Sequence, residues 1–154
     1  MSFWDPNIRK TSIKFLILAT IQGAALVYLY TLVGNPVVSK ETMSGIAYTG
    51  LFVVAVFIIA FGMVYYQKTA ENTKKKVPKG KMSKNDLIHF DNEKRSKYDT
   101  ANLVRWTCLL LCFWAGGHFY VIRQDISYLG VSFASFVFFL YHFPSGSKFK
   151  NDFF

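Results

Sequence analysis

The sequence predicts an all-α membrane protein: four transmembrane helices as two antiparallel hairpins, with a helical basic cytosolic loop between spans two and three. The first observation behind this prediction is composition, since 52% of the 154 residues are hydrophobic and only 18% are charged, against roughly a quarter charged in soluble domains. The second is charge distribution. The formal net charge is +9, yet almost all basic residues lie outside four long apolar segments, or at their edges.

The four apolar segments have the length of transmembrane helices. They comprise residues 13–33, 44–66, 103–122 and 126–143, each close to the roughly 20 residues that a helix needs to cross a bilayer core. Backbone polar groups in lipid need partners within their own segment, so helices are expected, and the alternating pattern of a β-barrel is absent. Arg105, in the first turn of the third segment, is expected to snorkel to the lipid headgroups and mark the edge of that span.

Short links between these segments predict helical hairpins. About ten residues (GNPVVSKETM) join the first segment to the second, and they include the turn Asn35-Pro36, which cannot continue a helix. Only a few residues around Gln124 join the third segment to the fourth. Because short links favour antiparallel neighbours, we expect hairpins over residues 13–66 and 103–143.

The basic residues predict the orientation. Of 18 Lys and Arg, three lie at the start of the first segment, eleven lie between residues 67 and 105, and two lie in the tail, which leaves only Lys40 and Arg123 for the other side. Cationic segments resist translocation, so both termini and the long loop are expected in the cytosol. The domains are then the cytosolic N-terminus (1–12), hairpin 1 (13–66), the basic cytosolic loop (67–102), hairpin 2 (103–143) and the cytosolic tail (144–154).

The apolar segments lack the ionisable groups that transport or catalysis within a membrane requires. His118 is expected to form an interfacial hydrogen bond rather than bind a metal. Cys108 and Cys112, at positions i and i+4, are expected to be packing residues, with palmitoylation as an alternative. No nucleophile–base set, phosphate-binding loop or carboxylate pair occurs, so we expect a non-enzyme without cofactor or metal. Small residues allow close helix contacts: Gly45, Gly50, Gly116, Gly117, Ala134 and Ser135.

The central loop contains a polycationic segment. Residues 74–84 include six lysines and no acid, interrupted by Pro78 and Gly80. A flexible polycation is typical of binding to polyanions, either RNA phosphates or anionic lipid headgroups, although a solvated loop that only fixes the orientation is the alternative. The candidate polyanion-binding residues are Lys74, Lys75, Lys76, Lys79, Lys81, Lys84, Lys94, Arg95 and Lys97.

The residues after the polycation predict a charged helix that runs into the third span. Ser83 and Asp86 have the spacing of a capping box, and Asp91 can pair with Lys94 and Arg95. One helical face then contains Leu87, Phe90, Lys94 and Tyr98. We expect about four turns of cytosolic helix, a stiff lever suited to contact with a large cytosolic body.

Two segments of the chain resemble the gamma subunits of the translocon-associated protein complex of the endoplasmic reticulum, also called signal sequence receptor gamma. The run Phe90–Asn102 (FDNEKRSKYDTAN) is similar to the stretch that leads into the third span of that family, and Pro144–Lys148 is similar to its Ser/Gly/Lys ending. That family has four spans, cytosolic termini and one long lysine-rich cytosolic loop. The chain differs in its short N-terminal tail and in the Phe-rich extension Phe149–Phe154.

The resemblance implies a non-catalytic accessory subunit of the protein translocon of the endoplasmic reticulum membrane. The implied partners are other translocon-associated subunits, the Sec protein-conducting channel, membrane lipid and the translating ribosome, whose rRNA phosphates or acidic protein surface the loop lysines would contact. Two alternatives remain open. One is an accessory subunit of a mitochondrial inner-membrane complex, such as the respiratory chain or ATP synthase. The other is a small transporter or lipid-handling enzyme, which would need intramembrane ionisable groups.

Overall fold

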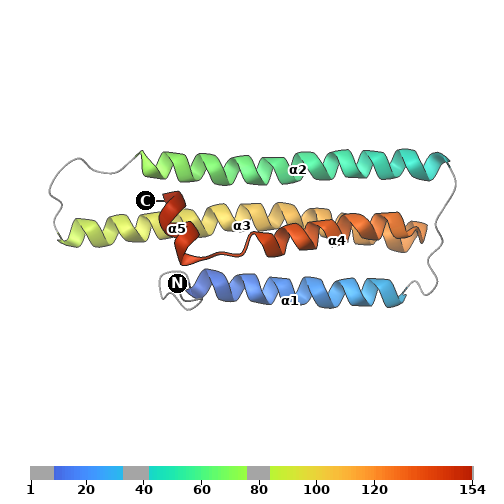
Figure 1. Ribbon diagram of the computed structural model, residues 1–154, viewed down its shortest axis with the longest axis horizontal. Coiled ribbons are helices and arrows are strands. Elements are labelled where there is room, and N and C mark those ends of the chain that lie inside the picture. The colour runs from blue at the N-terminus through green and yellow to red at the C-terminus, as the bar shows by residue number, and fades with distance from the viewer. Residues whose placement is uncertain (1–8, 33–41, 76–83, 154) are drawn as a thin grey trace.

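The computed structural model describes residues 9–32, 42–75 and 84–153, and these residues form five helices and no strand (Figure 1). The prediction of an all-α fold is therefore confirmed for the described part of the chain. The helices are α1 (Arg9–Leu32), α2 (Thr42–Lys74), α3 (Lys84–Arg123), α4 (Ile126–Tyr141) and α5 (Gly146–Phe153).

Helix α3 unites the predicted cytosolic helix and the third span. It is continuous over 40 residues, about 60 Å at 1.5 Å per residue. This agrees with the absence of Pro and Gly between Lys84 and Gly116. Its start at Lys84 agrees with the predicted capping box, of which Ser83 lies outside the described residues. Helix α2 continues past the predicted end of the second span at Tyr66, so much of the basic loop is itself helical.

A tight turn joins α3 to α4. Gln124 has a positive φ of 55°, the left-handed conformation that commonly ends a helix, and its N–H donates to the carbonyl of Tyr120 (2.8 Å). Asp125 is the N-cap of α4, where its carboxylate accepts from the N–H of Ser127 (2.9 Å). Such a short connection holds α3 and α4 antiparallel and in close contact.

The other predicted hairpin differs from expectation, because α1 and α2 are not packed against each other. Helix α2 lies along α3, whereas α1 lies along α3 and α4, and no Cα of α1 comes within 8 Å of one of α2 in the described residues (Figure 1). A link over residues 33–41 can reach about 30 Å when extended, and packed helices are only about 8–10 Å apart. A link of that length does not force its two helices to be neighbours.

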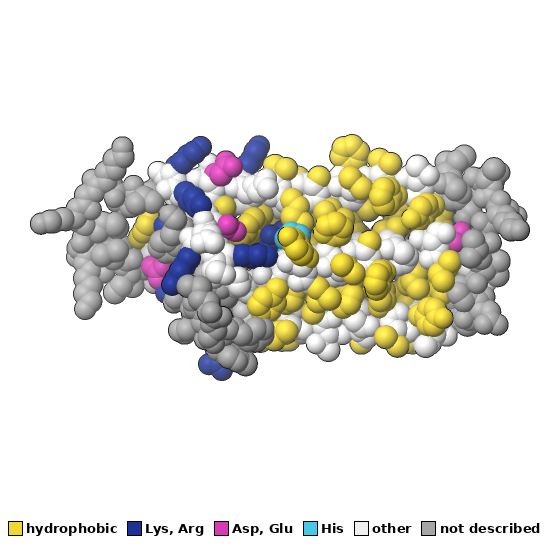
Figure 2. Space-filling model, viewed as in Figure 1, with side chains coloured by type: hydrophobic (Ala, Val, Ile, Leu, Met, Phe, Trp, Pro, Cys, Tyr) yellow, Lys and Arg dark blue, Asp and Glu magenta, His cyan; other side chains and the backbone are white. Residues whose placement is uncertain are grey.

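The outer surface of the bundle is strongly apolar. Val27 of α1 is 65% exposed and Phe57 of α2 is 72% exposed, and apolar side chains cover the part of the bundle away from the basic end (Figure 2). A soluble protein of this size rarely exposes so much contiguous apolar surface, which lipid tails can solvate. Two described helical segments, Arg9–Leu32 and Tyr48–Lys74, are long and apolar enough to cross a membrane, whereas apolar α4 has only 16 residues.

Aromatic packing and close backbone contact hold α1, α3 and α4 together. Phe15 stacks on Phe139 with ring centroids 4.6 Å apart and meets the edge of Trp106 at 5.4 Å. A Cβ on Gly116 would lie 2.9 Å from the carbonyl oxygen of Tyr128, so this glycine lets α3 approach α4, as the sequence predicts. Of the other predicted small residues, Gly117 faces α1, Ser135 is buried, Gly50 faces open space, Ala134 is exposed, and Gly45 lies outside the described side chains.

Gln22 of α1 is buried (1% exposed), and neither its Nε2 nor its Oε1 has a hydrogen-bond partner among the described residues. An unpaired buried amide destabilises the folded state, so Gln22→Leu is expected to stabilise the bundle by about 1–2 kcal/mol. Thermal unfolding of the purified protein in detergent measures this change, and Thr20→Leu on the exposed face of the same helix is the control. A lower midpoint for Gln22→Leu than for the unchanged protein would show that Gln22 has a polar partner.

Candidate functional site

The basic side chains gather at one end of the bundle. The start of α1, the end of α2, the first half of α3 and α5 all lie at that end (Figure 1), and Figure 2 shows Lys and Arg side chains concentrated there. Among the described residues the opposite end contains Arg123, the last residue of α3. This arrangement agrees with the sidedness expected from the sequence, while the membrane and the topology remain predictions.

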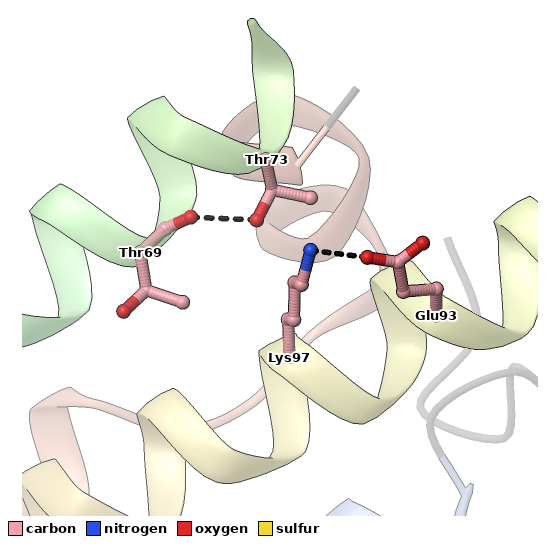
Figure 3. A network of polar contacts seen from close by, with 4 residues as sticks. All are labelled: Thr69, Thr73, Glu93 and Lys97. Atoms are coloured by element: carbon pink, nitrogen blue, oxygen red, sulfur yellow. Dashed lines mark hydrogen bonds and ion pairs between the residues drawn. The ribbon is translucent and has the colours of Figure 1, made fainter. Parts of the chain in front are cut away.

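A two-helix stalk projects from this end, formed by residues 67–74 of α2 and 84–102 of α3. The two segments lie side by side, and Ala70 of one packs in a buried cluster with Tyr98 and Ala101 of the other. Figure 3 shows buried Thr73 donating to the carbonyl of Thr69 (2.6 Å) on α2, close to an ion pair on α3. The sequence predicts one helix here, and the structure adds a second that stiffens it.

The nine predicted polyanion-binding residues comprise six lysines of the loop segment 74–84 and three cations on α3. Lys74 and Lys75, at the tip of α2, are exposed. Lys84 is the first residue of α3, but its side chain is not among those that the structure describes. Lys76, Lys79 and Lys81 lie outside the described residues.

The three candidate cations on α3 are less free than the sequence suggests. Arg95 pairs with Asp91, as predicted, and Lys97 pairs with Glu93. Such i,i+4 pairs contribute only about 0.3–0.5 kcal/mol, so a phosphate can replace either carboxylate.

Lys94 is not a surface cation, and this corrects the prediction. Only 2% of Lys94 is exposed, and its Nζ lies 4.5 Å from the centroid of the Phe90 ring. Burial lowers the pKa of Lys94. Lys94 is buried because it shares a helical face with Phe90 and Tyr98, and this face packs inward. The spacing of these three residues in the sequence was the signal that could have excluded Lys94 from the polyanion-binding set.

The Phe-rich tail forms helix α5, which packs against the base of the stalk. Phe149 and Phe153 insert between α2 and α3, with the ring centroid of Tyr98 5.0 Å from Phe149 and 5.3 Å from Phe153. Tyr66 donates its hydroxyl hydrogen to Asp152 (2.8 Å). Burial in this aromatic cluster, made of Tyr66, Tyr98, Phe149 and Phe153, raises the pKa of Tyr98 to about 12. The tail therefore fixes the angle between the two helices of the stalk.

Arg105 does not snorkel outward, contrary to expectation. It is 5% exposed, its guanidinium lies 4.1 Å from the centroid of the Tyr66 ring, and its Nη2 donates to Asn102 Oδ1 (2.5 Å). Its Nε is buried without a hydrogen-bond partner. Stacking on an aromatic face keeps the guanidinium in the gap between α2 and α3, an arrangement that depends on Tyr66, 39 positions earlier in the chain, and that no local pattern indicates.

The two cysteines are packed inside the bundle, and His118 lies on its surface. Cys108 and Cys112 are buried, and the Cys112 sulfur lies 3.6 Å from the carbonyl oxygen of Ala55, so both thiols are packed against α2. His118 is exposed. Over residues 9–32, 42–75 and 84–153, no three His, Cys, Asp or Glu side chains are close enough to hold a metal ion.

Comparison with known proteins gives no relative. No family model matches the chain, and neither a curated protein nor a solved structure matches it significantly.

Proposed function

We propose that this chain is a non-catalytic accessory subunit of the protein translocon of the endoplasmic reticulum. It crosses the membrane four times with both termini in the cytosol, contacts the translating ribosome through its lysine-rich loop, and holds other translocon-associated subunits and the Sec channel through its spans. The observation that supports this best is the segregation of the molecule into an apolar-surfaced helical bundle and one cationic end with a stiff stalk.

The stalk suits the ribosome as partner. Residues 84–102 extend about 28 Å along the helix axis, braced by α2 and α5, and the six-lysine segment joins the two stalk helices at their far end. That segment contains no aromatic residue, so it is suited to contacting phosphates without stacking on bases or reading their sequence. A rigid arm with a cationic tip can reach a large polyanionic body that docks at some distance from the bilayer.

Helix α4 is short for a membrane span, which is compatible with the thin bilayer of the endoplasmic reticulum. Its 16 residues extend about 24 Å, which is nearer to the roughly 27 Å hydrocarbon core of that membrane than to the 32–33 Å of the plasma membrane. A mitochondrial inner-membrane complex is the other candidate, since the same excess of basic residues would then face the matrix. Fractionation with mitochondrial rather than endoplasmic reticulum markers would overturn the proposed location.

The experiment is ribosome co-sedimentation with microsomes that contain the chain as their sole added component. Exchanging the six loop lysines for glutamine (Lys74, Lys75, Lys76, Lys79, Lys81 and Lys84) is expected to weaken binding roughly tenfold or more near physiological salt, because each phosphate contact releases counterions. The dependence of binding on salt should also become less steep.

A matched control keeps the loop and removes charge elsewhere at the same end. Lys10→Gln with Lys150→Gln neutralises two exposed cations outside the loop and should leave binding nearly unchanged. Equal binding of the six-glutamine variant and the unchanged chain across the salt series would refute a role for the loop in ribosome contact.

A further inference from the structure

A cavity of about 560 Å³ opens between the ends of α2 and α4 and helix α5. Its wall combines aromatic side chains with an excess of basic groups, and none of these groups has a role in the proposed ribosome contact except Lys74 at the rim. The residues that matter for its chemistry are Tyr66, Arg105, Tyr141, His142, Lys148 and Asp152.

The guanidinium of Arg105 is the unusual feature of this cavity. Arg105 is only 5% exposed and makes no ion pair within 4 Å among the described residues, although the carboxylate of Asp152 lines the same cavity. The protein accepts one hydrogen bond from it, at Asn102, and leaves Nε unpaired. A buried guanidinium without a directly paired carboxylate is unfavourable, and its spare N–H donors are well suited to bind a phosphate.

The other charged groups of the cavity reinforce this demand for an anion. Lys148 lies with its Nζ 5.5 Å from the Tyr141 ring centroid, and burial together with the nearby charge of Arg105 lowers the pKa of Lys148. Lys74 and His142 also line the wall. Two acids also line the wall: Asp152, which accepts the hydroxyl hydrogen of Tyr66, and the exposed Glu71. The cations Lys74, Arg105 and Lys148 therefore exceed the carboxylates of the cavity by one.

The cavity lies where the apolar stretches of two helices end, the level expected for lipid phosphate groups if these helices cross a bilayer. The apolar stretches of α2 and α4 end here, at Tyr66 and Tyr141, and Trp and Tyr are the residues that concentrate at membrane–water boundaries. Met63 and Tyr141, which is 76% exposed, form the wall nearest the apolar surface. Basic side chains reach up to that apolar surface in Figure 2.

We propose that this cavity binds the phosphate group of a membrane phospholipid, held by Arg105 and Lys148, with the acyl chains lying along the outer faces of α2 and α4. The phosphate accepts hydrogen bonds from guanidinium donors that the protein leaves unpaired, and the lipid fills the gap between α5 and the ends of α2 and α4. This proposal rests on the bundle lying in a bilayer, and it is independent of any contact with the ribosome.

The test uses the full chain purified in maltoside detergent and native mass spectrometry with added dioleoylphosphatidylglycerol. One phosphatidylglycerol is expected to bind saturably, and Arg105→Gln is expected to weaken its binding roughly tenfold or more, the effect of losing hydrogen bonds to a charged group. Lys148→Gln, on the half-buried rim, should weaken it in the same direction and decides the outcome if Arg105→Gln fails to fold. Arg105→Lys should restore part of the binding.

Two further probes identify the ligand. Dioleoylglycerol, which has the same chains without phosphate, should not bind at this site, whereas displacement of the lipid by millimolar inorganic phosphate would identify a free-phosphate site and overturn the lipid assignment. Arg95→Gln removes an exposed cation of the stalk and should bind lipid normally. Unchanged binding by Lys148→Gln and a folded Arg105→Gln would also overturn the proposal, while both variants should retain ribosome co-sedimentation.

Discussion

Replacing Gly116 with alanine is expected to destabilise the bundle by about 1–3 kcal/mol, the range for inserting a methyl group into a well-packed contact. The new Cβ would lie 2.7 Å from Ser132 Oγ and 2.9 Å from both the Ser132 nitrogen and the Tyr128 carbonyl oxygen. Two of these atoms belong to the backbone of α4, so relief requires α3 and α4 to separate. Separation also stretches the bond from Ser132 Oγ to the Phe113 carbonyl (2.6 Å).

Gly130, on α4, is the matched control for this substitution. A Cβ at that position meets nothing within 4 Å, so Gly130→Ala should be neutral or should stabilise the helix by up to about 1 kcal/mol. Circular dichroism during thermal or detergent-induced unfolding measures both variants. Equal midpoints for the two would contradict close backbone contact at the α3–α4 interface.

Phe153→Ala is the second substitution with a large expected effect, and it acts on the tail. Phe153 is fully buried among Tyr66, Tyr98 and Phe149, and truncating a buried Phe destabilises its surroundings by about 3–5 kcal/mol. Helix α5 has only eight residues, so a loss of this size is expected to detach it from the stalk while the spans remain folded.

Hydrogen exchange of the backbone amides in residues 146–153 reports this detachment directly. The expected result is rapid exchange in α5 and slightly faster exchange around Tyr98, with unchanged protection in α1 and α4. Phe133→Ala, which truncates a side chain that is 56% exposed, should leave α5 protected. Slow exchange of α5 in Phe153→Ala would show that Phe149 and the Tyr66–Asp152 hydrogen bond hold the helix without Phe153.

Detachment of α5 would also change the candidate sites on either side of it. Asp152 and Lys148 belong to α5, so the phosphate cavity would lose one wall and one cation. The stalk would lose its brace at the point where α2 and α3 leave the apolar part of the bundle. The tail thus connects the stability of the cationic end with both proposed activities.

Much of this architecture could be predicted because it depends on local composition. Apolar length predicts where helices form, since backbone groups without water must pair within one segment. The short link at Gln124 predicts the α3–α4 hairpin, and the absence of helix breakers after residue 83 predicts the continuous α3. The packing of α1 away from α2 could not be predicted in the same way, because it depends on which helix faces which. The spacing of Phe90, Lys94 and Tyr98 places Lys94 on one helical face with two aromatic residues, and the packing of the helices decides that this face lies inward.

The sequence by itself determined the helical class, the apolar surface, and the gathering of basic residues at one end of the bundle, because each follows from the order of residue types along the chain. Only the tertiary structure decided that α1 lies away from α2, that Phe149 and Phe153 fold back onto the stalk, and that Arg105 is buried against Tyr66. These three features depend on contacts between residues far apart in the chain. Their energies come from side-chain packing between helices, which cannot be predicted from a local sequence pattern.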